Sequence, residues 1–494
     1  MSFPYLSIIV FLPLIGAIVI ALLPGATPRQ VKRTAALFTS VVFILSVALF
    51  FMFDRSLSGP QFVEQASWIP ALNVQYYLGV DGLSLPMLIL TAMLGLIAVL
   101  VSWKIDLRAR EYFAWLLILE TGILGVFCSL DLILFFLFWE VELIPMYLLI
   151  SIWGSGRKEY SAMKFVLYTL VGSALMLAGI LLLYSQAGTF DMTVLAGMGL
   201  EAALGSLMAT AIFFLLFIGY AVKLPIFPLH TWLPDAHTDA PTAVSVILAG
   251  ILIKMGGYGM IRVCVGIFPE TAKDYAPLLV ALAVVGIIYG AAVTLRQTDL
   301  KRLIAYSSIS HMGFVLLGIF ALSQVSMTGA TLQMFSHGII TGLLFALAGL
   351  IYDKTHERSI PLLGGLARQM PIILVIFSVA GLAALGLPST SGFAAEFLVF
   401  LGSFNSEVVP GIQIYTVIGI LGVVLGAGYI LWMLQRVFYG TPKAQYDGVP
   451  DANRLEKVYI FSMVAVIMLI GIYPAILTDI MKMGVLPVLA PLGL

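Results

Sequence analysis

Fourteen apolar stretches of about 20 residues, separated by short polar segments, run along this 494-residue chain. An α-helix needs about 20 apolar residues to cross the roughly 30 Å hydrocarbon core of a membrane. The stretches lie near 2–23, 34–53, 82–103, 112–128, 131–153, 162–185, 206–226, 241–261, 276–295, 303–321, 328–352, 371–401, 411–435 and 458–478. Hydrophobic residues make up 61% of the chain and charged residues only 10%, a balance that a soluble domain could not present to water. The sequence therefore predicts an all-α polytopic membrane protein with about 14 transmembrane helices.

The distribution of Lys and Arg supports this count and orients the chain. With the N-terminus outside, 19 of the 25 Lys and Arg fall in inside segments and four in outside segments, as the positive-inside rule predicts. One span added or removed would invert every later loop and destroy this asymmetry. Both termini are expected outside. The first stretch is expected to be a retained helix, because it lacks the basic start and small-residue cleavage site of a signal peptide.

The two remaining cations, Lys223 and Lys254, lie inside apolar stretches. A charged side chain at mid-membrane costs roughly 2.5–3.5 kcal/mol, so such a residue usually faces a protein interior and has a function there. Four carboxylates lie at similar depth, namely Glu120, Glu140, Glu142 and Glu396. Together these groups suggest a path for protons.

Two of these carboxylates, Glu140 and Glu142, are only two residues apart. On a helix they point about 200° from each other and cannot both line one cavity. Burial disfavours the charged forms of a carboxylate and a lysine, whereas pairing favours them, so a pair that can open is a proton switch. We expect Lys223 to pair with Glu140. The alternative, which applies more strongly to Glu120, is a static buried ion pair that only fixes helix packing.

Two of the stretches contain helix breakers. Pro225 and Pro228 follow Lys223, and residues 386–392 read Gly-Leu-Pro-Ser-Thr-Ser-Gly. Because proline removes a backbone donor, both helices should break within the membrane, where the freed carbonyls must face protein or water. Paired broken helices in two halves of a chain point to a transport path. Ordinary proline kinks are the alternative.

Two histidines, His311 and His337, lie within the tenth and eleventh stretches, each just after a polar segment. Imidazole titrates near neutral pH and can pass a proton between its two nitrogens. We expect them to form a relay between Lys254 and Glu396. The alternative is that both are packing residues.

Metal and redox centres are not expected in this chain. His230 and His237 lie in an inside loop without Lys or Arg, and their proline-interrupted spacing matches no standard metal site. Cys128 and Cys264 are the only cysteines, too few for a four-thiolate iron–sulfur cluster or a structural zinc site. No glycine-rich nucleotide fingerprint follows a predicted strand. Any redox chemistry or ATP use is therefore expected in another chain.

Several motifs together resemble those of a known family. They are Phe138–Tyr147, Lys223–His237, Ala240–Ala243, Leu248–Lys254, Asp299–Gly313, Ser391–Phe397 and Tyr77–Ser84. The chain resembles the proton-translocating subunits shared by respiratory complex I and multisubunit cation/proton antiporters. Within that family it is most similar to subunit M, also called chain 4. The resemblance covers essentially the whole chain and is strongest from about 120 to 400.

The resemblance implies a domain organisation. Two inverted five-helix repeats are expected, each containing a broken helix, near 223–228 and 386–392. The expected parts are 1–110 with the first three helices and an outer loop at 54–80, 111–265 as the first half, 276–438 as the second half, and 439–494 as a C-terminal helix.

The resemblance also implies roles for six residues. Glu140 matches the carboxylate of the fifth helix, with Lys223 as its partner on the seventh. Lys254 matches the central lysine, His311 and His337 match linking positions, and Glu396 matches the terminal residue of the axis. The related chain 5 usually has lysine at the position of Glu396. No shared role is assigned to Glu120 or Glu142.

The implied function is that of a proton-pumping membrane-arm subunit of a redox-driven NADH:quinone oxidoreductase. It would carry no redox cofactor of its own, with FMN and iron–sulfur clusters in partner subunits. Antiporter-like subunits on both sides, lipid and protons are the expected partners, and nucleic acid is not. The expected location is the inner (plasma) membrane of a bacterium, with a thylakoid or other energy-transducing membrane as the alternative. A sodium/proton antiporter subunit, a ferredoxin-fed relative and a structural spacer remain as other functions.

Overall fold

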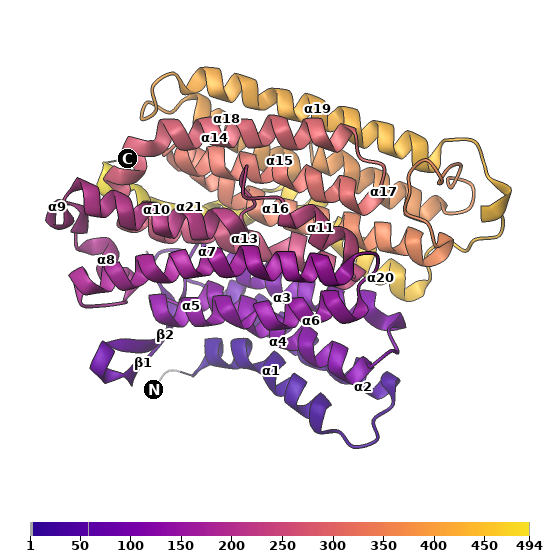
Figure 1. Ribbon diagram of the computed structural model, residues 1–494, viewed down its shortest axis with the longest axis horizontal. Coiled ribbons are helices and arrows are strands. Elements are labelled where there is room, and N and C mark those ends of the chain that lie inside the picture. Colours follow the sequence, from indigo (N-terminus) through magenta and orange to yellow (C-terminus); the bar gives the residue numbers. More distant parts are fainter. Residues whose placement is uncertain (1–2, 58, 494) are drawn as a thin grey trace.

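The computed structural model describes residues 3–57 and 59–493 of the chain. Its helices run roughly side by side along one axis and form a single bundle (Figure 1). From α1 to α19, chain order proceeds broadly from one flank of this bundle to the other. Helices α1 (Tyr5–Leu22) and α2 (Pro28–Met52) form one flank, and α19 (Ile412–Phe438) lies on the opposite flank.

Fourteen helical segments within the described residues are long and apolar enough to cross a membrane, which confirms the predicted class. Other long uninterrupted helices include α3 (Ser84–Val101), α4 (Ala109–Cys128), α7 (Lys158–Ala187), α14 (Pro269–Leu295), α15 (Leu300–Phe320) and α16 (Gln324–Thr355). Helices α5 (Leu132–Val141) and α6 (Leu143–Trp153) meet at Glu142 and share one crossing. Short helices α8 (Met192–Gly197) and α9 (Leu200–Leu204) precede α10.

Both predicted helix breaks are present. Helix α10 (Ser206–Lys223) ends before Pro225, and the chain becomes helical again in α11 (Trp232–Asp239). The stretch at 371–401 is two short helices, α17 (Pro371–Ala384) and α18 (Ser391–Phe404). The structure thus confirms both breaks. They occur at proline residues, which cannot donate the backbone hydrogen bond that would continue the helix.

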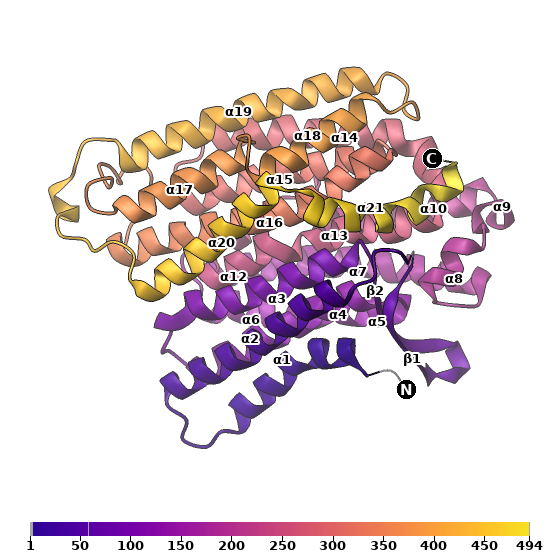
Figure 2. The same cartoon turned by 180° about the vertical axis from the view of Figure 1, so that it is seen from behind.

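The C-terminal part departs from the prediction of a single helix. Helix α20 (Arg454–Ile472) is followed by α21 (Ala475–Leu489), with Pro474 between them. Gly471 lies against the backbone of Ser389 and Thr390, so this interruption is beside the break between α17 and α18. Both helices contact α16, and together they follow it across the bundle (Figure 2). The apolar pattern continues through Pro474, which is why composition alone did not reveal the interruption.

The outer loop contains a β-hairpin that the sequence pattern did not predict. Strands β1 (Gln61–Ile69) and β2 (Val74–Val80) pair antiparallel. Asn73, in the turn between them, has a φ of 54°, a left-handed conformation that asparagine tolerates. Most of β2 is buried, whereas most of β1 is exposed. Such short strands leave no trace in a search for 20-residue apolar windows.

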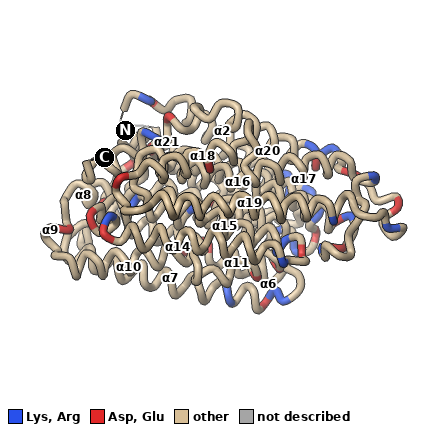
Figure 3. The backbone as a smooth tube through the Cα atoms, turned by 90° about the horizontal axis from the view of Figure 1, so that it is seen from above, with Lys and Arg blue, Asp and Glu red and all other residues tan. Residues whose placement is uncertain are grey.

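The distribution of charge identifies the inside end of the bundle, and burial identifies its centre. Lys and Arg gather at the end of the bundle near α6, α11 and α17, the end predicted to be inside (Figure 3). The apolar windows of α16 and of the segment Thr242–Val265 are 100% buried, whereas that of α2 is only 28% buried. The candidate site lies around these two central crossings.

Candidate functional site

The break after α10 places Lys223 at the C-terminal end of a helix. The last carbonyls of a helix have no intrahelical partner and carry a partial negative charge, which favours a cation there. Trp232 of α11 donates its indole N–H to the Val222 carbonyl at 2.9 Å. The second half of the broken helix thus satisfies a carbonyl that the break leaves free, and Lys223 is held at a fixed depth.

Lys223 forms an ion pair with Glu142, not with Glu140 as the sequence analysis expected. The side chains are 1% and 0% exposed. The ammonium also lies 5.2 Å from the ring centre of Trp139 and 5.6 Å from that of Phe165, positions in which aromatic rings attract a cation. The expected pairing is wrong because Glu142, at the junction of α5 and α6, is the carboxylate that faces the interior.

Glu140 lies close to this pair but is partly exposed. One of its carboxylate oxygens, Oε1, is buried and has no hydrogen-bond partner among the described residues. The two carboxylates point in different directions, as their two-residue spacing predicted, and only Glu142 contacts the lysine. Glu140 is a second carboxylate within electrostatic range of Lys223.

Lys254 is fully buried between two wide helical turns. The chain from Thr242 is α-helical in α12 (Thr242–Ile247) and α13 (Lys254–Gly259) and π-helical in Leu248–Leu252 and Met260–Val265. Such wide turns occur frequently at functional sites, because they free backbone groups. The Lys254 ammonium donates to the carbonyl of Ala249 and lies 2.8 Å from Nδ1 of His337. The sequence analysis gave no sign of these π turns.

His337 begins a row of polar side chains that reaches the second helix break. Its ring centre is 5.2 Å from that of His311. Nδ1 of His311 is 3.4 Å from Oε1 of Glu396 and 3.4 Å from Nε2 of Gln333. The structure therefore brings Lys254, His337, His311 and Glu396 together, with the two histidines between the lysine and the glutamate as expected; that His337 is the one next to Lys254 was not predicted. Gln333, which contacts the row from α16, belongs to the polar segment that precedes His337 and was not singled out in the sequence analysis.

A small cavity accompanies this row. It is lined by His311, His337, Gln333 and Glu396, among others, and has about 10 Å³ of room for the centre of a water molecule, close to the minimum for holding one water. Nε2 of His337 and Oε1 of Gln333 are buried and have no partner in the described part of the chain. The cavity thus offers unpaired polar atoms to a proton-carrying water.

The Lys223–Glu142 pair and the row that starts at Lys254 are separate polar groups. No hydrogen bond joins Lys223 to Lys254 within residues 3–57 and 59–493. Their helices are nevertheless packed closely, since a side chain at Gly256 of α13 would overlap the backbone of Tyr220 and Leu224. A small movement of α10 against α13 would change the distance between the two lysines.

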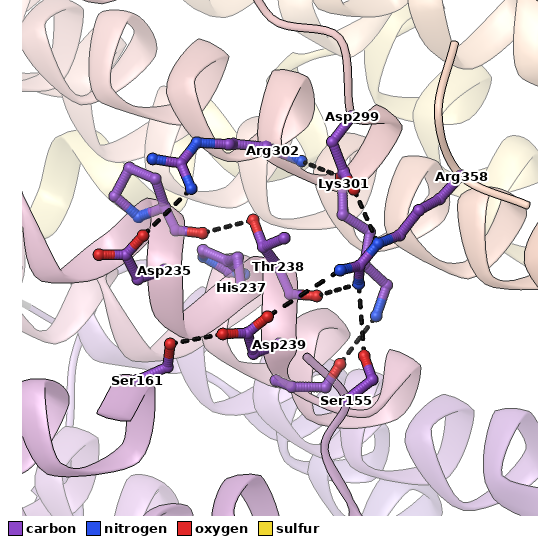
Figure 4. Close-up of polar contacts among 12 residues, drawn as sticks. Ser155, Ser161, Asp235, His237, Thr238, Asp239, Asp299, Lys301, Arg302 and Arg358 are labelled. Carbon is purple, nitrogen blue, oxygen red and sulfur yellow. Dashed lines mark hydrogen bonds and ion pairs between the residues drawn. The ribbon is translucent and has the colours of Figure 1, made fainter. Parts of the chain in front are cut away.

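A cluster of ion pairs closes the inside end of the bundle (Figure 4). Asp235 of α11 pairs with Lys164 at 2.7 Å and with Arg302 at 3.1 Å. Arg358 pairs with Asp299 at 2.7 Å and donates to the Thr238 carbonyl at 2.7 Å. The segment from Trp232 is a buried helix and not the loop that the sequence analysis assumed, because cations from α7, α15 and the 356–360 segment neutralise its carboxylates.

His230 and His237 lie in this part of the structure. His237 is fully buried and stacks on Phe345 with ring centres 4.7 Å apart. Neither ring nitrogen of either histidine has a hydrogen-bond partner among the described residues. Across the same residues, no group of three or more His, Cys, Asp or Glu is arranged to hold a metal ion.

Glu120 of α4 is buried away from this row. Its carboxylate lies against Gly95 of α3, where any side chain would overlap it. Its Oε1 has no hydrogen-bond partner in the described residues, so the static ion pair considered for it is not formed with any of them. Nothing in the structure gives this carboxylate a role.

Comparisons with known proteins agree with these observations. The family model described as NADH:quinone oxidoreductase/Mrp antiporter, TM, matches residues 129–422. The chain is 45% identical to NAD(P)H-quinone oxidoreductase chain 4 1 of Synechococcus elongatus, over 97% of this chain and 90% of that one. It is 43% identical to NADH-quinone oxidoreductase subunit M of Rhodobacter capsulatus, over 96% and 94%.

Solved structures share the fold. A chain of respiratory complex I from Thermus thermophilus with bound NADH superposes with a TM-score of 0.88 at 29% identity, covering 98% of this chain and 99% of that one. A chain of the Mrp complex from Dietzia sp. superposes with a TM-score of 0.88 at 21% identity, covering 99% and 98%, which is a likeness of fold. The chain belongs to the NADH:quinone oxidoreductase/Mrp antiporter transmembrane family.

Proposed function

We propose that this chain is a proton-translocating membrane-arm subunit of an NADH:quinone oxidoreductase. The observation that carries the proposal is the row of Lys254, His337, His311 and Glu396 inside an apolar bundle. Successive members are separated by 2.8 Å between nitrogens, 5.2 Å between ring centres and 3.4 Å between nitrogen and oxygen. Buried ionisable groups in a membrane are costly and mark ion or proton paths. The similarity to subunit M and chain 4 over nearly the whole chain supports the same function.

In the proposed cycle the Lys223–Glu142 pair is the switch. While the pair is closed, both charges are stabilised by each other; when it opens, the buried ammonium loses that stabilisation and gives up its proton more easily. Glu140 is the second carboxylate to which Lys223 can turn. The change in charge reaches Lys254 through the packed α10 and α13.

The proton then moves along the row. Lys254 passes a proton to His337, whose imidazole hands it to His311, and Glu396 receives it at the broken helix α17–α18. The break lies beside Glu396, because a side chain at Gly386 would overlap this carboxylate, as in transporters whose discontinuous helices line the path. Residues 111–265 and 276–438 are the two halves related by inversion in this proposal, with the switch in the first and the exit in the second.

The driving redox reaction takes place in partner subunits. FMN and iron–sulfur clusters there would accept electrons and pass them to quinone, and this chain responds to the resulting conformational or electrostatic change. Antiporter-like neighbours would pack on the apolar flanks at both sides. The proposed location is the plasma membrane of a bacterium or a thylakoid membrane.

The first experiment isolates the native complex through a tag on this chain. Reduction of co-purifying flavin and iron–sulfur centres by NADH is the expected result. Reduction only by ferredoxin would assign the chain to a ferredoxin-fed relative. Absence of both cofactors, with sodium-stimulated proton flux in vesicles, would contradict the proposal and favour a multisubunit sodium/proton antiporter.

A second experiment tests the path itself. In the assembled complex, Lys223→Ala should lower proton pumping sharply and leave assembly intact. Normal pumping in this variant would contradict the proposed switch. Normal pumping in the variants Lys223→Ala, Lys254→Met and Glu396→Gln alike would favour a structural spacer.

A further inference from the structure

A cavity opens at the outer face of the first half of the chain. It has a volume of about 180 Å³ and lies between residues 53–57 and 59–60 of the outer loop, the start of α3, helix α8 and the end of α21. Asp81 and Arg262 line it, together with apolar groups. We call this cavity the outer vestibule. It lies far along the chain from Glu396, which the proposed cycle uses as the end of the path.

An ion pair forms part of the wall of the outer vestibule. Nη2 of Arg262 is 2.5 Å from Oδ2 of Asp81, and the two side chains are 14% and 9% exposed. The other carboxylate oxygen of Asp81 accepts the backbone N–H groups of Leu83 and Ser84 at 3.0 and 3.1 Å. Asp81 is therefore fixed by the backbone, and Arg262 is the partner that can move.

Polar groups continue inward from this pair toward the buried lysines. Nε of Arg262 is 3.3 Å from the hydroxyl of Tyr258, and the guanidinium lies 5.4 Å from the centre of that ring. Tyr258 is one helical turn from Lys254 on the same helix, where Cβ atoms lie about 5–6 Å apart. Because the Lys254 ammonium points back toward the Ala249 carbonyl, a chain of waters is needed to join it to the Tyr258 hydroxyl. Arg262, Tyr258 and Lys254 thus follow one another at four-residue steps from the outer face to mid-membrane.

A second tyrosine lies beside this series. Tyr220 of α10 is fully buried, and its ring packs against Gly259, next to Tyr258. Its hydroxyl has no hydrogen-bond partner among the described residues. It is one turn from Lys223, and its ring centre is 5.7 Å from that of Trp139, which the Lys223 ammonium also approaches. Both buried lysines therefore have a tyrosine one turn nearer the outer vestibule.

We propose that Asp81, Arg262 and Tyr258 form a gate between the outer vestibule and Lys254. In the closed state the guanidinium is an electrostatic barrier that keeps protons of the outer solution from Lys254, as an arginine does in other narrow pores. When Arg262 moves away, the Tyr258 hydroxyl oxygen accepts a proton from the vestibule side and releases its own proton toward Lys254. One O–H bond forms as the other breaks, so the tyrosine ends unchanged. This inference rests on the proposed function, since it assigns an outer gate to the same buried lysine.

The competing explanation is structural. Asp81 caps the start of α3, and Arg262 would then only anchor the outer loop to the segment Met260–Val265. A structural anchor predicts that loss of Arg262 weakens the fold without opening a path for protons. The two explanations differ in the passive proton permeability of the assembled complex.

The test measures that permeability without electron transfer. The complete complex, carrying Arg262→Gln, is placed in proteoliposomes, and proton entry is followed by a pH-sensitive dye under a potassium diffusion potential without NADH. A gate predicts at least a fivefold increase in proton leak. In the double variant Arg262→Gln with Tyr258→Phe, the relay is removed and the leak should return to within twofold of wild type.

The matched control is Arg55→Gln, another outer arginine, whose guanidinium lies only over the Phe50 ring at 5.6 Å. This control should leak like wild type. A wild-type leak in an assembled Arg262→Gln complex would overturn the gate. So would a double variant that leaks as much as the single one, because Tyr258 would then have no part in the path.

A fallback variant covers failure of Arg262→Gln to assemble. Asp81→Asn keeps an oxygen that can accept the Leu83 and Ser84 N–H groups, so the cap on α3 is retained while the arginine loses its charged partner. The gate predicts at least a threefold rise in leak, and a wild-type leak in the assembled variant would contradict it. Because this assay uses no NADH, the gate can fail while Lys223→Ala still lowers pumping sharply, and the gate can hold while Lys223→Ala pumps normally.

Discussion

Replacement of Glu142 by Gln tests the pairing on which the proposed switch depends. Lys223 is 1% exposed and Glu142 0% exposed, so the variant would leave an ammonium in an apolar pocket beside Trp139 and Phe165 without its contact partner. Removing one member of a buried ion pair costs about 3–5 kcal/mol. That cost corresponds to a shift of roughly 150- to 5,000-fold in the folding equilibrium of the variant.

The assay is the ratio of protons pumped to NADH oxidised by the purified complex in proteoliposomes. We expect Glu142→Gln to lower this ratio by more than half. We expect Glu140→Gln to have the smaller effect, since Glu140 does not contact the lysine. The double variant Glu142→Gln with Lys223→Met should withstand heating better than Glu142→Gln alone, because it removes the unpaired charge.

The opposite pattern would refute this reasoning. If Glu140→Gln abolished pumping while Glu142→Gln pumped normally, Glu140 would be the working partner of Lys223, as the family resemblance implies. A double variant no more heat-resistant than the single one would show that the lysine carries no unpaired charge in Glu142→Gln.

Three further predictions follow from particular contacts. His337→Phe removes the link between Lys254 and His311 and should lower the ratio of protons to NADH while NADH oxidation by the isolated complex persists; an unchanged ratio would exclude the histidine relay. Gly290→Ala places a methyl carbon 2.6 Å from the Ser310 backbone nitrogen and should destabilise the α14–α15 contact by about 1–3 kcal/mol, whereas Gly286→Ala, with nothing within 4 Å on the same helix, should be neutral or stabilising; thermal release of the chain from the complex measures both, and equal behaviour would contradict this packing. Arg358→Gln removes the bonds to Asp299 and Thr238 and should cost about 1–2 kcal/mol, seen as a smaller yield of assembled complex; an unaltered yield and melting temperature would show that the inside cluster is not needed for stability.

Much of the architecture could be predicted from the sequence because the membrane imposes simple rules. Length and apolarity identified the crossings, and proline marked the breaks after Lys223 and before Ser391. The β-hairpin at 61–80 and the interruption at Pro474 were missed. Neither changes the apolarity of a 20-residue window, and the hairpin depends on pairing between strands, which a linear pattern does not reveal.

The candidate site was predicted in part. The placing of two histidines between Lys254 and Glu396 could be anticipated because each of the four residues lies in a different apolar stretch and all lie at similar depth, whereas the order of His337 and His311 could not. The partner of Lys223 could not, because spacing shows only that Glu140 and Glu142 diverge and not which one faces inward. The α5–α6 junction at Glu142 decides which carboxylate faces inward. The position of this junction depends on its packing against α4, where Gly122 lies close to the Phe138 carbonyl oxygen.

Other features of the site left no signal in the sequence. The π turns around Lys254 depend on how the helix fits its neighbours, and no residue type marks them. The pairing of Asp81 with Arg262 joins residues far apart in the chain. In the sequence Arg262 cannot be told from an exposed outer cation, because its burial and its contact with Tyr258 depend on the folded structure.

The central claim is that protons cross the membrane through Lys254 when the complex oxidises NADH. The most direct test is the number of protons moved per NADH by the complete complex carrying Lys254→Met, compared with wild type in the same proteoliposomes. Methionine has a similar length and no proton to give, so the proposed row predicts a clearly lower ratio in a complex that still contains this chain. An unchanged ratio in that fully assembled variant would contradict the proposed path.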